Sequence, residues 1–293
     1  MFHRSRLAPV LVVTAAVVAG AWPTAAFAAT QPRLGTALNF AAIAGSTITN
    51  TGPTVIKGNV ALSPGSAVTG FPPGISAVRN IADANAVKAK TDLVTAFTDA
   101  ASAPSTSNLT GKNLGGLNLT AGVYSFSSSA QLTGKLTLSG TGVFIFRIGS
   151  ALTTATASAV LLRNGAQACA VYWEVGSSAT LGSATQFQGN LMALTSITMV
   201  TGANILTGRA MARNGALTLD TNQITPPSGT CTAASTTRTS TPTTPTTPST
   251  GAVAPGSALP GLGILATIVG GLMVLAGRRR PRLDGQSRRP PLG

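Results

Sequence analysis

The chain has 293 residues and a formal net charge of +14, yet only 9% of its residues are charged. Arg4, Arg6 and six arginines after residue 277 supply much of that charge, so the residues between them are only mildly basic. Nucleic-acid binding requires clustered Lys and Arg with aromatic residues for stacking, and neither cluster is present, which argues against a nucleic-acid partner.

Residues 1–28 have the pattern of a secretory signal peptide. Two arginines precede an apolar run over residues 7–22, and Ala26-Phe27-Ala28 gives the small-x-small pattern of a cleavage site. The alternative is a transmembrane anchor that is kept. Pro23, which breaks a helix just before the cleavage pattern, favours cleavage. The sequence therefore predicts export, and a folded domain over residues 29–231.

A helix is predicted over residues 79–101. Its small and apolar residues fall on one helical stripe: Ala82, Ala86, Ala89, Leu93, Ala96, Phe97 and Ala100. Asp83, Lys88, Lys90 and Asp92 lie off that stripe, and Pro104 follows the end. A single one-faced helix in a β-rich chain is expected to pack against a sheet.

Downstream the pattern changes to short strands that repeat about every 20 residues. Thr180-Leu181, Thr198-Met199 and Thr218-Leu219 align, and each continues to an apolar position, Phe187, Ile205 or Ile224; Gly189 and Gly208 follow the first two. This period is typical of a β-solenoid. The alternative is a β-sandwich, because Asn164-Gly165 and Asn214-Gly215 match hairpin turns.

The two cysteines, Cys169 and Cys231, are expected to form a disulfide, as an isolated pair in an exported domain usually does. Such a bond would tie the end of the domain back onto its body. A catalytic or metal-binding pair of thiols is the alternative, but it lacks supporting residues.

The segments after residue 231 have three distinct compositions. Residues 232–258 are rich in Thr, Ser and Pro, and we expect an extended stalk. Residues 259–277 form an uncharged run long enough to span a bilayer, and the basic residues 278–293 would lie in the cytoplasm. This order is similar to a bacterial cell-wall sorting signal. Leu262 replaces the threonine of the LPxTG pattern, so a membrane anchor is the prediction.

Residues suited to catalysis are scarce. The only histidine is His3, inside the predicted signal peptide. Apart from the acidic residues of the helix segment, only Glu174 and Asp220 remain before residue 232, too few for most hydrolytic or calcium-dependent sites. We therefore expect a protein that is not an enzyme and has no metal or cofactor.

Alternation along the strands predicts which residues point outward. With Ala155 and Ala157, Ala179 and Leu181, Ile197 and Met199, and Leu217 and Leu219 inward, the outward residues are Thr154, Thr156, Ser178, Thr180, Ser196, Thr198, Ala216 and Thr218. Thr47 and Thr49 are expected to add a further coil. High β-propensity explains each threonine singly. A whole face without charge instead suits a regular partner such as a crystal, a polymer or another sheet.

Several motifs in order resemble the microbial ice-binding proteins. They are the runs Gly140–Gly149, Leu152–Thr156, Tyr172–Gly182 and Ala212–Asp220, and the likeness covers about residues 33–227. The resemblance implies a mainly β fold, a right-handed β-solenoid with one long α-helix packed alongside. It also implies a domain that binds an ice surface through the outward residues above, as an antifreeze, recrystallisation or ice-adhesion protein. We expect this domain to be a monomer.

Two other functions remain open on the sequence. A cell-surface adhesin could bind a polysaccharide or another cell through the same face. Such faces usually present exposed aromatic rings, whereas Phe144, Phe146, Tyr172 and Trp173 fall in strands expected to be buried or to face the helix. The third possibility is a structural spacer without a ligand.

Overall fold

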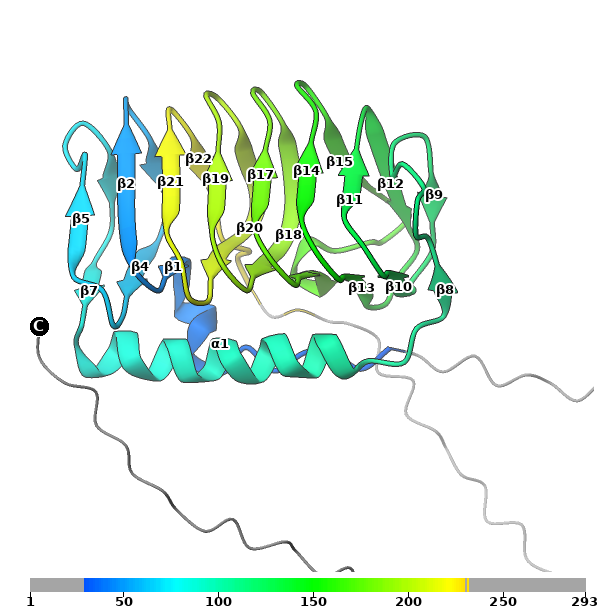
Figure 1. Ribbon diagram of the computed structural model, residues 1–293, viewed down its shortest axis with the longest axis horizontal. Helices are drawn as coiled ribbons and strands as arrows, with labels where there is room; N and C mark the ends of the chain where they lie inside the picture. Colours follow the sequence, from blue (N-terminus) through cyan, green and yellow to red (C-terminus); the bar gives the residue numbers. More distant parts are fainter. Residues whose placement is uncertain (1–28, 230, 232–293) are drawn as a thin grey trace, which may run out of the picture. The chain divides into compact units, whose positions relative to one another are not determined.

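The computed structural model describes residues 29–229 and residue 231, which form a β-solenoid with one long helix along its side (Figure 1). Every named strand pair in this part of the chain is parallel. Parallel pairing of successive coils confirms the predicted solenoid and excludes the sandwich, whose hairpins would be antiparallel.

One side of the solenoid is a seven-stranded sheet whose strands lie side by side (Figure 1). In spatial order they are β11 (Ala130–Leu132), β14 (Leu152–Thr154), β17 (Ala179–Leu181), β19 (Ile197–Met199), β21 (Leu217–Asp220), β2 (Thr47–Thr51) and β5 (Ala67–Thr69). Each coil contributes one strand, so equivalent residues of successive coils stand in line.

A fifteen-stranded sheet forms the other two sides. The helix face consists of β8 (Ser107–Asn108), β10 (Gly122–Phe126), β13 (Phe144–Ile148), β16 (Val171–Val175), the later parts of β18 (Gln186–Ala193) and β20 (Asn204–Ala212), β1 (Phe40–Ala44), β4 (Asn59–Leu62) and β7 (Arg79–Ile81). The third face consists of β9 (Asn118–Leu119), β12 (Lys135–Ser139), β15 (Ala159–Arg163), the first parts of β18 and β20, β22 (Gln223–Ile224), β3 (Val55–Ile56) and β6 (Ile75–Ser76). The long strands β18 and β20 turn the corner between these two faces, because β18 pairs with β15 at its start and with β16 at its end.

The chain does not wind the solenoid from one end to the other. After the short 3-10 helix η1 (Gly35–Asn39), strands β1–β7 build coils at one end, and α1 (Ala84–Ser102) then runs along the solenoid to the other end (Figure 1). The later coils return toward the first ones, so β20, β21 and β22 pair with β1, β2 and β3. These three pairs form a seam between the start and the end of the domain.

The interior is filled by apolar residues from all three faces, with an aromatic stack at its centre. The ring centroids of Phe146 and Trp173 lie 4.0 Å apart, and Tyr124 and Phe187 extend the stack on either side. Tyr172, on the opposite side of its strand, packs toward the helix instead. The structure confirms that these aromatic rings are buried rather than displayed.

Helix α1 begins five residues later than the sequence indicated. Residues 79–81 form strand β7, and Asp83 caps the helix by accepting a hydrogen bond from the Ala86 N–H at 2.8 Å. Ala82 has a φ of 51°, which ends any helical pattern there. The rest of the predicted stripe is buried as expected: Ala86, Ala89, Leu93, Ala96, Phe97 and Ala100.

The predicted disulfide is present. Cys169 is the middle residue of the 3-10 helix η2 (Ala168–Ala170), and its Cα lies 5.7 Å from that of Cys231. Closing a loop of 62 residues stabilises a fold by about 4 kcal/mol in the chain-entropy description. The end of the domain is thus held against its middle.

The other predicted segments lie outside the described residues. They are the signal peptide 1–28, the stalk 232–258, the membrane span 259–277 and the basic tail 278–293. Among the helices of residues 29–231 that the structure describes, none has the length and apolar character needed to cross a bilayer.

Candidate functional site

The outer side of the seven-stranded sheet carries a column of threonines. In β14, β17 and β19 the first and third residues are buried and the middle residue points outward. These middle residues and their partners in the neighbouring strands stand in register across the sheet: Thr69, Thr49, Thr218, Thr198, Thr180, Thr153 and Gln131. Six consecutive coils therefore present a threonine at the roughly 4.8 Å spacing of paired strands. We call this outer surface the threonine face.

A second column of small residues lies two positions before the threonine column along the chain, about 6.7 Å away. Its members are Ala67, Thr47, Ala216, Ser196, Ser178, Ala151 and Ser129. Backbone hydrogen bonds between neighbouring coils, such as Ala179 N–H to the Ser196 carbonyl at 2.9 Å, keep the column aligned. The face is therefore a two-dimensional array of methyl and hydroxyl groups.

Most of the residues predicted for this surface occupy it. The structure places Ser178, Thr180, Ser196, Thr198, Ala216 and Thr218 on the two columns, and it also places Thr47 and Thr49 there. The Thr49 hydroxyl lies 3.4 Å from that of Thr218 across the seam. The N-terminal segment thus extends the face, as the sequence suggested.

The prediction for strand β14 was wrong by one residue. Thr154 points into the solenoid and is only 2% exposed, while Thr153 takes the outward position opposite Thr180. Thr156 is exposed but lies in the turn after the strand. The inward hydroxyl is accommodated because Thr154 Oγ1 lies 2.8 Å from Thr185 Oγ1 and accepts the Gly182 N–H at 2.9 Å.

A short sequence repeat indicates which threonine of a strand points outward, which alternation alone did not show for β14. Gly-Ser-x-apolar-Thr occurs at residues 45–49, 65–69, 149–153 and 176–180, and its final threonine is the outward residue each time. This repeat identifies Thr69 and Thr153, which the alternation of small residues did not. Gln131 and Ser129 at the end of the face carry no such signal.

Glycine occupies the first position of the repeat for a steric reason. At Gly65 an added Cβ would lie against the Ser46 carbonyl oxygen, and at Gly176 it would lie 2.8 Å from the Gly149 carbonyl oxygen. Successive coils approach closely at this corner, so only glycine fits. In the four coils that carry this repeat, the close approach fixes where the strand starts and hence which threonine faces outward.

The threonine face is nearly free of charge. Among the outward positions of its seven strands, all of which the structure describes, only Asp220 is charged, and it lies at the edge of the face. Thr201 and Thr221 both donate hydrogen bonds to its carboxylate. The central surface is therefore polar through hydroxyls alone.

The two columns use their hydroxyl groups differently. Ser178 Oγ accepts the Ser196 N–H at 3.3 Å, and Ser196 Oγ accepts the Ala216 N–H at 3.1 Å. The serine hydroxyls therefore connect neighbouring coils by hydrogen bonds. Within the described residues, the hydroxyls of Thr180 and Thr198 have no hydrogen-bond partner in the protein. The hydroxyls of Thr180 and Thr198, at the centre of the threonine column, are thus free to bind water.

Strongly shifted pKa values occur away from this face. Burial raises the pKa of the Glu174 carboxyl on the helix face to about 7, with a smaller opposing effect of Arg147. Burial, and then the charge of Arg213, lowers the pKa of Lys90 on α1 to about 8. Within the described residues, no group of three or more His, Cys, Asp or Glu side chains could hold a metal ion.

Comparison with known proteins gives consistent matches over the solenoid. A family model described as ice-binding-like matches residues 42–225. An ice-binding protein of Nostoc sp. (strain HG1) is 51% identical over 218 residues, which cover 73% of this chain and 81% of that protein. One from Flavobacterium frigoris (strain PS1) is 36% identical and covers 66% of this chain and 76% of its own length.

Solved structures agree with these matches. The crystal structure of an ice-binding protein from an Antarctic biological consortium superposes with a TM-score of 0.66 at 46% identity, covering 68% of this chain and 92% of that chain. That of an ice-binding protein from the Antarctic ascomycete Antarctomyces psychrotrophicus gives 0.65 at 39% identity, with 67% and 98% covered.

Proposed function

The chain belongs to the ice-binding-like family, and from that premise we propose that it adsorbs to ice through the threonine face without catalysing a reaction. The observation that carries the proposal is the column of six threonines in register. Adsorption to ice would slow crystal growth or recrystallisation, or hold the protein at the crystal.

The array suits an ordered layer of water. Threonine methyls limit the orientations of the water between them, and the unpartnered hydroxyls of Thr180 and Thr198 anchor that water to the protein. The buried residues beneath the column, including Leu181 and Met199, hold the strands at a fixed spacing. A surface with regular spacing in two directions fits a crystal better than it fits a single small molecule.

An adhesin that binds a polysaccharide or another cell is the second candidate. Sugar-binding surfaces commonly stack aromatic rings on the ligand. The seven strands of the threonine face carry no aromatic residue, and Phe146 and Trp173 are enclosed in the core. A spacer without a ligand would have no need of a charge-free array. The absence of aromatic residues from these strands and of charge from the two columns both favour ice as the ligand.

Export and surface display form part of the proposal. The disulfide fits an oxidising compartment, and Ala29, directly after the predicted cleavage site, packs against the residues beneath α1. The composition of residues 232–293 supports a stalk, a membrane span and a basic cytoplasmic tail. Protease treatment of intact cells followed by detection of each segment would test this arrangement.

Partition into a slowly growing ice hemisphere tests the function directly. The fragment 29–231 should enter the ice, and Thr198→Tyr should stay in the liquid because the ring disrupts the centre of the array. Thr137→Tyr is the matched control, since Thr137 points outward from β12 on the third face.

The outcomes separate the candidates. Entry of the wild type and of Thr137→Tyr, with exclusion of Thr198→Tyr, supports ice binding through this face. Exclusion of all three proteins, with unchanged circular dichroism, would refute ice binding and favour the adhesin. Equal entry of all three would place ice binding on another surface.

A further inference from the structure

The disulfide closes a loop of chain that contains much of the threonine face. Cys169 and Cys231 lie 62 residues apart in the sequence, and strands β16 to β22 all fall between them. Three of the seven threonine-face strands, β17, β19 and β21, belong to this loop. Force that arrives at Cys231 can therefore reach Cys169 through the sulfur atoms without passing through these strands.

The last residues of the domain depend on this bond for their attachment. Thr225 donates its N–H to the Ile205 carbonyl at 3.1 Å and accepts the Gly208 N–H at 2.8 Å. Beyond Thr225, the described residues 226–229 and 231 make no backbone hydrogen bond, and Pro226 and Pro227 have no N–H to donate. The disulfide is thus the principal attachment of residue 231.

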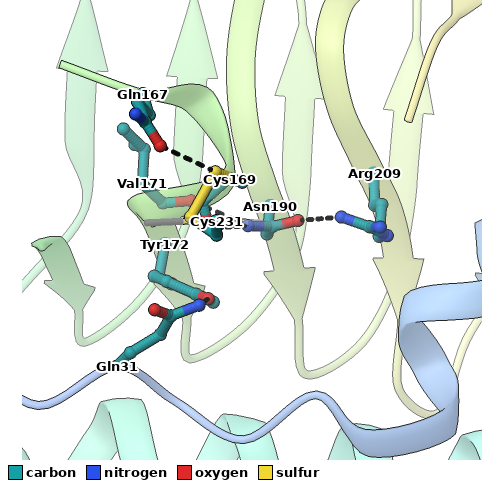
Figure 2. Close-up of a disulfide and its surroundings, with 8 residues drawn as sticks. All are labelled: Gln31, Gln167, Cys169, Val171, Tyr172, Asn190, Arg209 and Cys231. Atoms are coloured by element: carbon teal, nitrogen blue, oxygen red, sulfur yellow. Dashed lines mark hydrogen bonds between the residues drawn. A yellow bond between two sulfur atoms is a disulfide. The ribbon is translucent and has the colours of Figure 1, made fainter. Parts of the chain in front are cut away.

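The other end of the disulfide is anchored in the core (Figure 2). The buried Asn190 side chain donates to the carbonyls of Cys169 and Val171, each at 3.2 Å. Arg209 donates to Asn190 Oδ1 at 2.9 Å and to the Leu38 carbonyl at 2.9 Å. This chain of bonds connects the backbone around Cys169 to the N-terminal segment. Gln167 Oε1 lies 3.6 Å from Cys169 Sγ, but a disulfide sulfur has no proton, so this contact adds no hydrogen bond.

Strand β22 would be the weak point without the disulfide. It has only two residues, Gln223 and Ile224, and it pairs with β20 on one side and β3 on the other. Residues 232–293 continue beyond Cys231, so a force applied to them is transmitted to this end of the domain. Loss of β22 would open the seam, and β21 with its threonine would be next along the chain.

We propose that the Cys169–Cys231 disulfide is a mechanical clamp that keeps the threonine face intact when the C-terminal end of the chain is pulled. Load passes from Cys231 to Cys169 and into the core through the side chains of Asn190 and Arg209. Because the disulfide bypasses the chain between the two cysteines, strands β22 and β21 are not pulled away in turn from their C-terminal end. This role is independent of which ligand the threonine face binds.

Pulling single molecules in an optical trap tests the clamp. The full chain carries handles at both ends, and the oxidised wild type is compared with Cys169→Ser/Cys231→Ser. The variant is expected to show an additional early extension at a force lower than any rupture of the wild type. Its length should match release of residues 204–231, at about 3.3–3.6 Å per residue. Dithiothreitol added to the wild type should produce the same early step, without any substitution.

Leu136→Ala serves as the control for a general loss of stability. Leu136 is fully buried in β12, outside the disulfide loop, so the substitution leaves a cavity but keeps the clamp. This variant is expected to lack the early step. The proposal is overturned if the double serine variant first ruptures at the wild-type force, or if Leu136→Ala shows the same early release of residues 204–231.

Discussion

The threonine face and the third face belong to the same coils, and both are open to solvent, yet their side chains differ in kind. The third face presents Lys57, Lys135 and Arg163, together with glutamines of β18. The two columns of the threonine face carry no charge. Exposure and β-propensity act equally on both faces, so they do not explain the threonine columns.

Charged residues on exposed strands keep them soluble and discourage pairing with other strands. The third face follows this pattern, while the helix face avoids it because α1 covers large residues such as Ile145, Met192 and Met211. Within the described residues, the two columns of the threonine face have neither charge nor a covering element. The contrast supports the proposal that its side chains contact something outside the domain.

A charge placed on each face in turn should produce the largest difference in ice binding. Thr180→Asp is expected to reduce partition into ice to background, because a carboxylate binds its own hydration shell and interrupts the ordered water. Gln186→Asp, in the same coil but on the third face, should leave partition unchanged. Both variants should unfold within about 0.5 kcal/mol of the wild type, because both sites are at the surface. Ice partition of the two variants, together with thermal unfolding, provides the measurement.

If Gln186→Asp also prevented entry into ice, net charge rather than the face would be responsible. The distinction between the two faces would then lose its functional meaning. Retention of binding by Thr180→Asp would instead show that the centre of the column does not contact ice.

The helix face and the threonine face should differ in the effect of pH: stability should depend on it through the helix face, and ice binding should not. The folded-state pKa of Glu174, about 7, lies above its ordinary value of 4.5, so its contribution to stability is full below pH 4.5 and is lost as the pH rises through 7. The loss is at most about 3 kcal/mol. Lys90 affects stability in a different pH range. Its folded-state pKa of about 8 lies below the ordinary value of 10.5, so the stability of the fold rises as the pH rises above 8.

Thermal unfolding between pH 4.5 and 7 measures this effect. The wild type should become less stable across that range, and Glu174→Gln should remove the slope. Partition into ice should stay constant over the same range, because no residue of the two columns titrates there. A pH-dependent partition at temperatures where the domain is folded would contradict the assignment of binding to the threonine face.

Adjacent threonines in β14 provide the next test, since one points outward and the other inward. Thr154→Val should cost about 1 kcal/mol of unfolding free energy. Thr185 Oγ1 and the Gly182 N–H each lose one buried partner, and each keeps a backbone carbonyl as acceptor. Thr153→Val should leave stability nearly unchanged and weaken ice binding slightly. Chemical denaturation and ice partition of the two variants measure both effects. The reverse result would restore the register that alternation predicted.

The sequence predicted the general architecture well because its signals were long and repeated. The helical stripe from Ala86 to Ala100, the alignment of Thr180 with Thr198 and Thr218, and the cysteine pair are each confirmed. These features depend on periodicity and pairing, which local residue patterns record.

The details that failed are those that local patterns leave ambiguous. In Leu152–Thr156 every residue after the leucine is small, so either threonine could face inward until the Thr185 partner is known. Residues 79–81 have no feature that separates a strand from a helix start, and pairing with β4 decides it. The seam between the first and last coils depends on contacts far apart in the sequence, which no local pattern shows.

The smallest effect is expected at the corner where the threonine face meets the third face. Ala184 has a φ of 57°, a left-handed conformation in which its Cβ is strained, and Gly202 occupies this corner in the next coil with a φ of 70°. Ala184→Gly should therefore stabilise the domain by about 0.5 kcal/mol, the relief of strain less the added entropy of the unfolded chain. Ice partition should not change, because the corner lies beside the two columns rather than on them. Thermal unfolding would detect the gain, and a loss of stability would show that the Ala184 side chain contributes more by contact than its backbone costs in strain.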